Sequence, residues 1–256
     1  MAVGGMLVYE KFAALYDELM EVDYEAWLDT IEGLWQGKRP NLVLDLCCGS
    51  GGMTAALEGR GYTPIGVDVS AEMLAEAREK LSPEALLLCQ DMRELDLYGT
   101  VDAALCLCDS LNYLETEDDL RRVFQKVNLF LEPGGLFIFD MNTPYQFAEV
   151  LGENTFAETT EDAAYIWEND FDPEEGVNTF AVTFFARQPD GSYERFFELH
   201  QEFAYPLERV WALLKEAGLI PLAVYDGYTG EKAGADSGRW LIVARESGKA
   251  PQTTEK

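Results

Sequence analysis

The sequence predicts an α/β fold in which a mostly parallel, doubly wound sheet is covered by helices on both faces. Short apolar runs without polar alternation recur along residues 41–142, which is typical of parallel strands that are buried on both sides. Amphipathic segments with helical spacing separate these runs, as the crossover between parallel strands requires. The crossovers are expected to be right-handed.

Five strands and the helices between them can be placed from this alternation. Each strand is a short apolar run, and each following helix shows apolar positions at helical spacing. The strands are expected at 41–48, 63–70, 85–90, 101–108 and 136–142, and the helices from 52 to about 60, at 71–81 and at about 118–131. A helix at 206–217 and strands at 219–226 and 239–245 follow. The last two strands are expected to form a terminal antiparallel hairpin that completes a seven-stranded sheet.

Two helices are predicted before the sheet. Apolar and aromatic side chains recur at helical spacing in residues 12–19 and again in 24–34. Gly37 and Pro40 then break the pattern.

Residues 155–205 interrupt the α/β pattern. Polar and apolar side chains alternate here, and the turn-rich segments DPEEG and QPDGS separate the alternating stretches. This arrangement predicts antiparallel hairpins. The organisation expected is therefore N-terminal helices at 1–40, a ligand-binding core at 41–146, an antiparallel β insertion at 155–205, completion of the core at 206–246 and a flexible tail at 247–256.

The charge balance narrows the classes of partner. The chain carries 19 Lys and Arg against 47 Asp and Glu, a net charge of −28, and its basic residues come at most in pairs. Because nucleic-acid binding depends on replacing counterions with Lys and Arg, a nucleic-acid substrate is not expected. An acidic surface would attract a neutral or cationic small molecule, and it equally well maintains solubility.

Membrane and metal partners are not expected either. No stretch reaches the roughly 18 apolar residues of a membrane helix, and the N-terminus lacks the pattern of a secretory signal, so a cytoplasmic protein is expected. Five cysteines without a CxxC pair and a single histidine make a zinc site unexpected, because zinc needs about four nitrogen or sulfur ligands. The edge strands of the insertion are compatible with a homodimer.

A glycine-rich turn, GSGG at 49–52, follows the first strand and can approach a nucleotide-like ligand closely. The sharper signal is Asp45, a carboxylate inside an apolar run. It suits an ammonium group of the ligand and opposes a pyrophosphate, because two anions would face each other. Asp68 ends the second strand, where an acid commonly accepts hydrogen bonds from ribose hydroxyls. Together these residues predict a ligand that contains adenosine.

Five motifs, in order, resemble those of class I S-adenosylmethionine (SAM)-dependent methyltransferases. They are VLDLCCGSG (43–51), GVDVSAEML (66–74), CQDM (89–92), LCLCDSLNYL (105–114) and LEPGGLFIFD (131–140). The resemblance covers residues 41–142 and implies a Rossmann-like fold, SAM as the cofactor and methyl transfer as the reaction. One departure is that Cys47 stands where the first glycine of D-x-G-x-G-x-G lies, which argues against a dinucleotide fingerprint.

The resemblance also implies which residues hold the cofactor. The methionine end would lie against the acid of the first strand and its turn, and the ribose against the acid that ends the second strand. The adenine would lie among residues that follow the second and third strands, and the sulfonium beside the fourth. In that order the residues are Asp45, Cys48, Gly49, Ser50 and Gly51; Asp68; Val69, Met73, Asp91 and Met92; and Cys108 and Asp109.

The N-terminal segment YEKFAALYDELM (9–20) resembles the lid helix of small-molecule methyltransferases, including glycine and amino-sugar N-methyltransferases. There a tyrosine reaches the cofactor, which makes Tyr16 the expected contact and Tyr9 the second choice. The alternative is that both tyrosines only pack the helix. The acceptor implied is a small molecule, with an amine as one candidate.

The acceptor is expected at the carboxyl edge of the sheet, where ligands of open α/β sheets bind. Asn112 and Tyr113 follow the fourth strand at this edge and are expected to contact it. The insertion and the N-terminal helices would roof the site, with aromatic side chains such as Trp167 lining it.

No catalytic triad is evident, since transfer from a sulfonium needs mainly an oriented nucleophile. Asp109 and His200 are the candidate catalytic groups, with His200 as a general base. On its alternating strand, His200 shares a face with Glu198 and Glu202, a pattern that favours a solvated face.

Two other functions stay open at this point. A nicotinamide-dependent oxidoreductase would share the sheet and Asp68, but it needs a GxGxxG sequence that CCGSGG (47–52) does not supply. A non-catalytic SAM-binding protein would keep the cofactor residues while the acceptor cavity is blocked.

Overall fold

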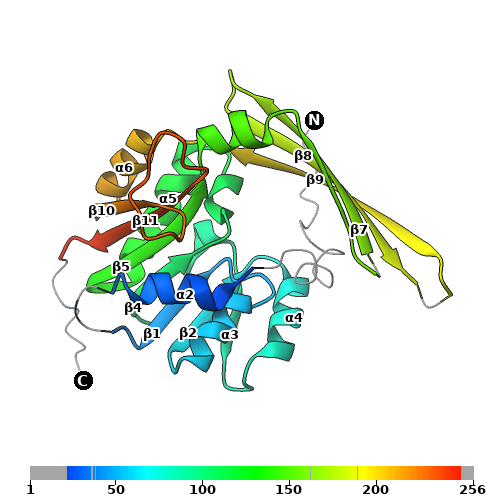
Figure 1. Ribbon diagram of the computed structural model, residues 1–256. Coiled ribbons are helices and arrows are strands. Elements are labelled where there is room, and N and C mark those ends of the chain that lie inside the picture. The colour runs from blue at the N-terminus through cyan, green and yellow to red at the C-terminus, as the bar shows by residue number, and fades with distance from the viewer. Residues whose placement is uncertain (1–21, 36, 38, 162, 189, 249–256) are drawn as a thin grey trace.

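A seven-stranded sheet forms the centre of the molecule in the computed structural model, which describes residues 22–35, 37, 39–161, 163–188 and 190–248 (Figure 1). Its order is β10-β11-β5-β4-β1-β2-β3. The strands are β1 (Leu42–Leu46), β2 (Thr63–Asp68), β3 (Leu86–Cys89), β4 (Val101–Cys106), β5 (Leu131–Asn142), β10 (Leu219–Asp226) and β11 (Arg239–Glu246). Strands β1 to β5 are parallel, and β11 runs antiparallel to both β5 and β10. The predicted fold class, including the terminal antiparallel hairpin, is confirmed.

Helices cover both faces of this sheet, as the two-sided apolar strands require. They are α2 (Tyr24–Glu32), α3 (Gly52–Gly59), α4 (Ala71–Lys80), α5 (Glu117–Phe130) and α6 (Leu207–Glu216). Phe137 and Phe139 of β5 pack with α5 and α6 on one face, whereas Leu136 and Ile138 pack with α2 and α3 on the other. Consecutive residues of one strand therefore fill two separate cores.

Helix α5 shows how the local sequence fixes its own ends. Thr116 caps it, because its hydroxyl accepts a 3.1 Å hydrogen bond from the amide of Asp119. Three acidic residues in its first turn lie at the positive end of the helix dipole. On the inner face, Phe124 is fully buried and packs against the stacked rings of Phe137 and Phe139, at centroid distances of 6.1 and 5.6 Å.

The insertion forms a separate four-stranded antiparallel sheet with the order β6-β7-β8-β9 (Figure 1). Its strands are β6 (Thr155–Thr159), β7 (Ala163–Asp172), β8 (Val177–Arg187) and β9 (Tyr193–Phe203). A small core of Phe180, Val182 and Phe184 lies on its inner face, and Tyr113 of the main domain packs against this core. The insertion is therefore attached to the carboxyl edge of the main sheet.

Three elements differ from the sequence expectation. Strand β5 begins at Leu131, five residues early, because Leu131 already pairs with Val101 of β4 across a register irregularity. Strand β6 was missed, since its sequence TFAET is half polar and mostly exposed. A π-helical turn, Gln146–Leu151, links β5 to the insertion.

The helix expected at 12–19 lies outside the described residues. In the described part of the chain, no helix has the length and apolar character to span a membrane.

Candidate functional site

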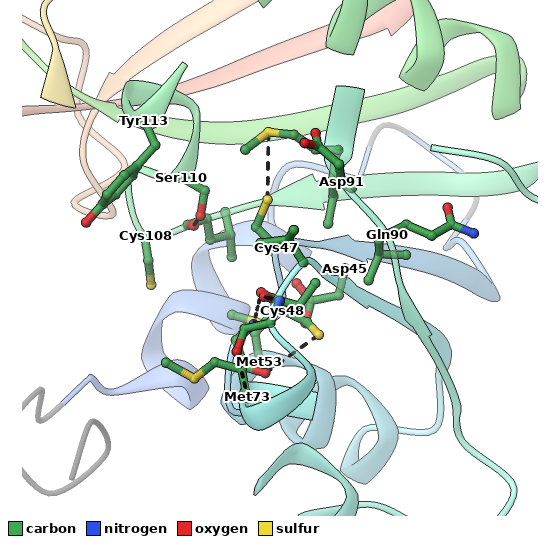
Figure 2. Close-up of a pocket in the computed structure, with 18 of the residues that line it drawn as sticks. Asp45, Cys47, Cys48, Met53, Met73, Gln90, Asp91, Cys108, Ser110 and Tyr113 are labelled. Carbon is green, nitrogen blue, oxygen red and sulfur yellow. Dashed lines mark hydrogen bonds between the residues drawn. The ribbon is translucent and has the colours of Figure 1, made fainter. Parts of the chain in front are cut away.

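A cavity of about 460 Å³ opens at the carboxyl ends of β1 to β4 (Figure 2). It lies where the strand order changes direction between β4 and β1, which is the usual ligand position in an open α/β sheet. Many residues expected from the sequence line it: Asp45, Cys48, Gly49, Ser50, Asp68, Val69, Met73, Asp91, Met92, Cys108 and Tyr113.

The turn after β1 forms the floor of this cavity. Cys47 has a φ of 63°, a left-handed conformation that glycine adopts at little cost and other residues rarely adopt. Cys47 therefore adopts the backbone conformation that the first glycine of D-x-G-x-G-x-G would adopt at little cost. Gly51 has a φ of 82°, and a Cβ there would lie 2.7 Å from the Cβ of Ala77. Gly51 does not line the cavity but permits the turn to pack against α4.

Asp45 is buried, with 2% of its surface exposed, and the hydroxyl of Thr54 donates a 2.5 Å hydrogen bond to its carboxylate. Burial raises the pKa of Asp45 to about 7, although the bond from Thr54 opposes this rise. At neutral pH the carboxyl group is therefore poised between its two protonation states. A cationic ligand group beside it would favour the ionised form.

Asp68 connects the glycine turn to the start of α4. One of its oxygens accepts a 2.8 Å bond from the amide of Gly49, and the other accepts a 2.9 Å bond from the amide of Ser70. Burial raises the pKa of Asp68, and these backbone bonds oppose the rise. Since each carboxylate oxygen has two acceptor positions, Asp68 retains capacity for ligand hydroxyls.

Asp91 follows β3 and carries an ion pair. Its Oδ2 lies 2.6 Å from Nη2 of Arg93, and this guanidinium lowers the pKa of Asp91. Among the described residues that line the cavity, Arg93 is the single cation, and its charge is already balanced. The described lining therefore offers a pyrophosphate no uncompensated positive side chain.

The opposite end of the cavity lies after β4. Cys108 and Asp109 both have left-handed backbones, with φ of 57° and 49°. Cys108 lines the cavity, but Asp109 does not, because its carboxylate lies 2.7 Å from Nη1 of Arg239. Asp140 of β5 is fully buried and accepts hydrogen bonds from the amides of Cys108 and Asp109.

Asn112 and Trp167 were expected beside the acceptor, but the structure places neither in the lining of the cavity. Asn112 is fully buried, and its amide group donates to the carbonyls of Asn142 and Phe203 at 3.2 and 3.0 Å. It thus joins β5 to β9. Trp167 packs inside the insertion, 5.6 Å from the ring of Phe180.

His200 is also placed differently from the sequence expectation. The solvated face was wrong, because His200 and Glu202 are only 5% and 4% exposed. The imidazole stacks on Phe180 at 4.8 Å, and its Nε2 lies 3.1 Å from a carboxylate oxygen of Glu198. The imidazole makes an edge contact with the ring of Tyr113, at a centroid distance of 6.0 Å, and does not line the cavity. A catalytic role for His200 or Asp109 stays a prediction.

Tyr9 and Tyr16 lie outside the described residues. Several lining residues were not foreseen: Tyr24, Met53, Ser70, Gln90, Arg93 and Ser110. Tyr24 belongs to α2, and its ring covers Gly52 so closely that a Cβ there would lie 2.2 Å from Cε2. Spacing along the sequence carries no signal for such a contact, although the third glycine of the GSGG turn, Gly52, permits it.

Comparison with known proteins agrees with this geometry. The family model described as "Methyltransferase domain" matches residues 43–135. YqeM of Bacillus subtilis (strain 168), which carries a provisional methyltransferase name, is 36% identical over 94% of this chain and 98% of its own length. The crystal structure of an S-adenosylmethionine-dependent methyltransferase from Clostridium acetobutylicum superposes with a TM-score of 0.84, at 35% identity over 94% of this chain and 99% of that one.

A more distant relative has a named substrate. The dTDP-3-amino-3,4,6-trideoxy-alpha-D-glucopyranose N,N-dimethyltransferase of Streptomyces venezuelae is 29% identical over 51% of this chain and 54% of that protein. The near full-length matches decide the assignment, and they set aside the oxidoreductase alternative. The chain belongs to the class I S-adenosylmethionine-dependent methyltransferase family.

Proposed function

We propose that this chain binds SAM in the cavity and transfers its methyl group to a small-molecule acceptor. The observation that carries the proposal is the placement of three acids, Asp45, Asp68 and Asp91, at the ends of three consecutive strands around one cavity. Asp45 would face the ammonium group of the methionine end, Asp68 the ribose hydroxyls and Asp91 the adenine amino group. Each pairing joins an acceptor to a donor.

The chemistry of the lining fits this cofactor. Val69, Met73 and Met92 supply apolar surface beside Asp68 and Asp91, where an adenine ring would pack. When bound, SAM supplies an electrophilic methyl group on its sulfonium. The residues of the chain then have to bind, orient and exclude water, because in-line orientation alone can account for about 7–11 kcal/mol of a barrier.

An amine is the acceptor class that we favour. The Streptomyces venezuelae relative is named as a methyltransferase of an amino sugar, and another relative from Halorhodospira halochloris is named as a glycine/sarcosine N-methyltransferase. The strongly acidic chain suits a cationic or neutral acceptor better than an anionic one. Tyr113 and Ser110 line the end of the cavity that is nearest the insertion, where such an acceptor would enter.

Isothermal calorimetry with SAM, S-adenosylhomocysteine and NAD tests the cofactor. We expect micromolar binding of the first two and no binding of NAD, and tight NAD binding without SAM heat would refute the proposal. Methyl-labelled SAM incubated with panels of amines, amino sugars, carboxylic acids and thiols then tests the acceptor. Transfer confined to acids or thiols would remove the amine from the proposal.

A further inference from the structure

We propose that Tyr228, Asp140 and Arg239 form a clamp that positions the Cys108 wall, the side of the cavity lined by Cys108, Ser110 and Tyr113, for methyl transfer. The inference rests on the proposed function and adds three positioning residues to it, all from segments outside the glycine turn. Tyr228 lies in the connection between β10 and β11, Arg239 begins β11, and Asp140 lies near the end of β5. None of the three lines the cavity itself.

The Cys108 wall needs contacts from other segments to hold it, because its backbone conformation at Cys108 and Asp109 is unfavourable. Cys108 and Asp109 are consecutive residues with a Cβ, and both have φ in the left-handed region, at 57° and 49°. Such conformations persist only when the surrounding structure holds them. This pair of residues turns the chain from β4 into the short helix Ser110–Tyr113, so it sets the position of Ser110 and Tyr113 as well.

Asp140 supplies the constraint directly. Its two carboxylate oxygens accept from the amide of Cys108 at 3.2 Å and from the amide of Asp109 at 2.6 Å. The phenol of Tyr228 donates to Oδ2 of Asp140 at 2.5 Å, and Nη1 of Arg239 lies 3.2 Å from the same oxygen. The carboxylate of Asp140 thus contacts Tyr228 and Arg239 through Oδ2, and it accepts the two backbone amides of the turn.

Arg239 closes the clamp on the other residue of the turn. Its Nη1 lies 2.7 Å from Oδ1 of Asp109, so a single guanidinium bridges Asp109 and Asp140. Burial lowers the pKa of Arg239, but the charges of Asp109 and Asp140 outweigh it and raise the pKa above its ordinary value. Arg239 is therefore the cation between these two carboxylates, and its removal would leave Asp109 and Asp140 close together without a positive partner.

Tyr228 also connects this wall to helix α2. Its ring stacks on Trp27 of α2 at 3.9 Å with an interplanar angle of 9°, and the hydroxyl of Thr30 donates to its carbonyl at 2.9 Å. The same helix carries Tyr24, which lines the cavity. Tyr228 therefore links the two walls that carry Tyr24 and Cys108.

The clamp lies apart from Asp45, Asp68 and Asp91, the acids that would bind the ammonium, ribose and adenine groups of the cofactor. Figure 2 shows Cys108, Ser110 and Tyr113 on one side of the cavity, with Gln90 and Asp91 on the other. A displacement of the Cys108 side would spoil the alignment of donor and acceptor, to which transfer rates are sensitive, while the bonds from Asp45 and Asp68 stay intact.

The first test needs no cofactor. Tyr228→Phe removes one hydroxyl and keeps the ring on Trp27. Tyr62→Phe is the control outside the cavity lining, since it removes a phenol that donates a 2.7 Å bond to the carboxylate of Glu32 and accepts a 2.9 Å bond from the indole of Trp35. Alkylation by iodoacetamide, mapped by mass spectrometry, reports on the wall, because Cys108 is half-buried in it and burial raises the pKa of its thiol, so a looser wall should speed the reaction. Cys48, which is buried and lines the same cavity, serves as the internal reference.

We expect Tyr228→Phe to speed alkylation of Cys108 by roughly fivefold or more, with Cys48 within about twofold of the wild type, as a local opening requires. The control should change neither rate. If Tyr228→Phe left the alkylation rate of Cys108 unchanged, or raised that of Cys48 equally, the clamp proposal would be overturned.

The second test separates positioning from binding. With SAM and an acceptor found in the screen, Tyr228→Phe should lower kcat by about tenfold and leave the calorimetric affinity for SAM within about threefold. Arg239→Lys should retain more activity than Arg239→Met; if the latter does not fold, the Tyr228→Phe results decide. Loss of SAM affinity in Tyr228→Phe with kcat intact would contradict the inference. Wild-type protein that does not bind SAM would refute the proposed function instead, and the alkylation test would still stand.

Discussion

The hydroxyl of Thr54 donates a 2.5 Å hydrogen bond to the carboxylate of Asp45, and both side chains are buried in the first strand–helix unit. This single bond does not offset the cost of burying a charge, since the pKa of Asp45 still rises to about 7. The carboxylate is thus kept at a cost to the stability of the protein without ligand, and this cost has measurable consequences.

Asp45→Asn should stabilise the ligand-free protein at alkaline pH. The folded pKa of about 7 exceeds the unfolded value of about 3.9, so the wild type loses stability as the pH rises from about 4 to 7, and the loss is complete above that window. Asparagine does not ionise and can still accept the bond from Thr54. Thermal unfolding at pH 8 should show a melting temperature several degrees higher in the variant, with little difference near pH 4. A lower melting temperature at pH 8 would mean that Asp45 is ionised and stabilised in the free protein.

SAM affinity should depend on pH through the same group. An ammonium beside Asp45 favours the ionised form, so below about pH 7 binding must release a proton and weaken by up to about tenfold per pH unit. Above pH 7 this dependence should disappear. Calorimetry in two buffers with different ionisation enthalpies measures the proton release at pH 6. Asp45→Asn, as the control, should bind weakly and release none; an identical pH profile in the variant would assign the proton to another group.

Asp68→Ala should weaken SAM binding by roughly tenfold or more, the equivalent of one hydrogen bond to a charged group. Affinity should fall for two reasons. The variant loses the ribose contact, and it loses the hydrogen bonds that Asp68 accepts from the amides of Gly49 and Ser70, which hold the glycine turn. Asp102→Ala is a matched control: Asp102 likewise accepts two backbone amides, from Asn41 and Leu42, at the opposite end of β1. The control should lose stability without losing affinity. Equal affinities of Asp68→Ala and the wild type would place the ribose elsewhere.

Replacement of residues 155–201 by a short Gly-Ser linker should leave SAM affinity within about threefold and abolish transfer to the acceptor. The replacement keeps Glu202 and Phe203, because Asn142 and Asn112 donate hydrogen bonds to them from the main domain. Phe197→Ser is the control, since its side chain is 51% exposed, and transfer should be retained. Full activity in the truncated protein, with only a change of oligomeric state by size-exclusion chromatography, would show that the insertion is a dimerisation platform.

The sheet could be predicted from the sequence because its strands are buried on both sides and therefore appear as unbroken apolar runs. Strand β11, which lies between β5 and β10 and is largely buried, was placed within one residue of its observed bounds for this reason. The same criterion misses β6, an edge strand with mostly exposed side chains, whose pairing with β7 depends on the backbone and not on burial.

The site was predictable where chemistry follows a strand end, as at Asp45, Asp68 and Asp91. It was not predictable where function depends on contacts between distant segments. Asn112 follows a strand as Tyr113 does, yet the 3₁₀ turn buries one and leaves the other at the cavity. Arg239 and Asp109 are 130 positions apart by their residue numbers, and nothing in either neighbourhood signals their ion pair.

The placement of β11 between β5 and β10 separates the order of synthesis from the order of assembly. During translation, β5 emerges long before β11, its neighbour on one side. Strand β10 has no partner strand until β11 emerges and pairs with both. Arg239 is the first residue of that last strand, so the Cys108 wall has no ion pair until nearly all of the described chain has left the ribosome. In nascent chains arrested before residue 239 the Cys108 wall should therefore lack this constraint, so its positioning depends on the synthesis of β11.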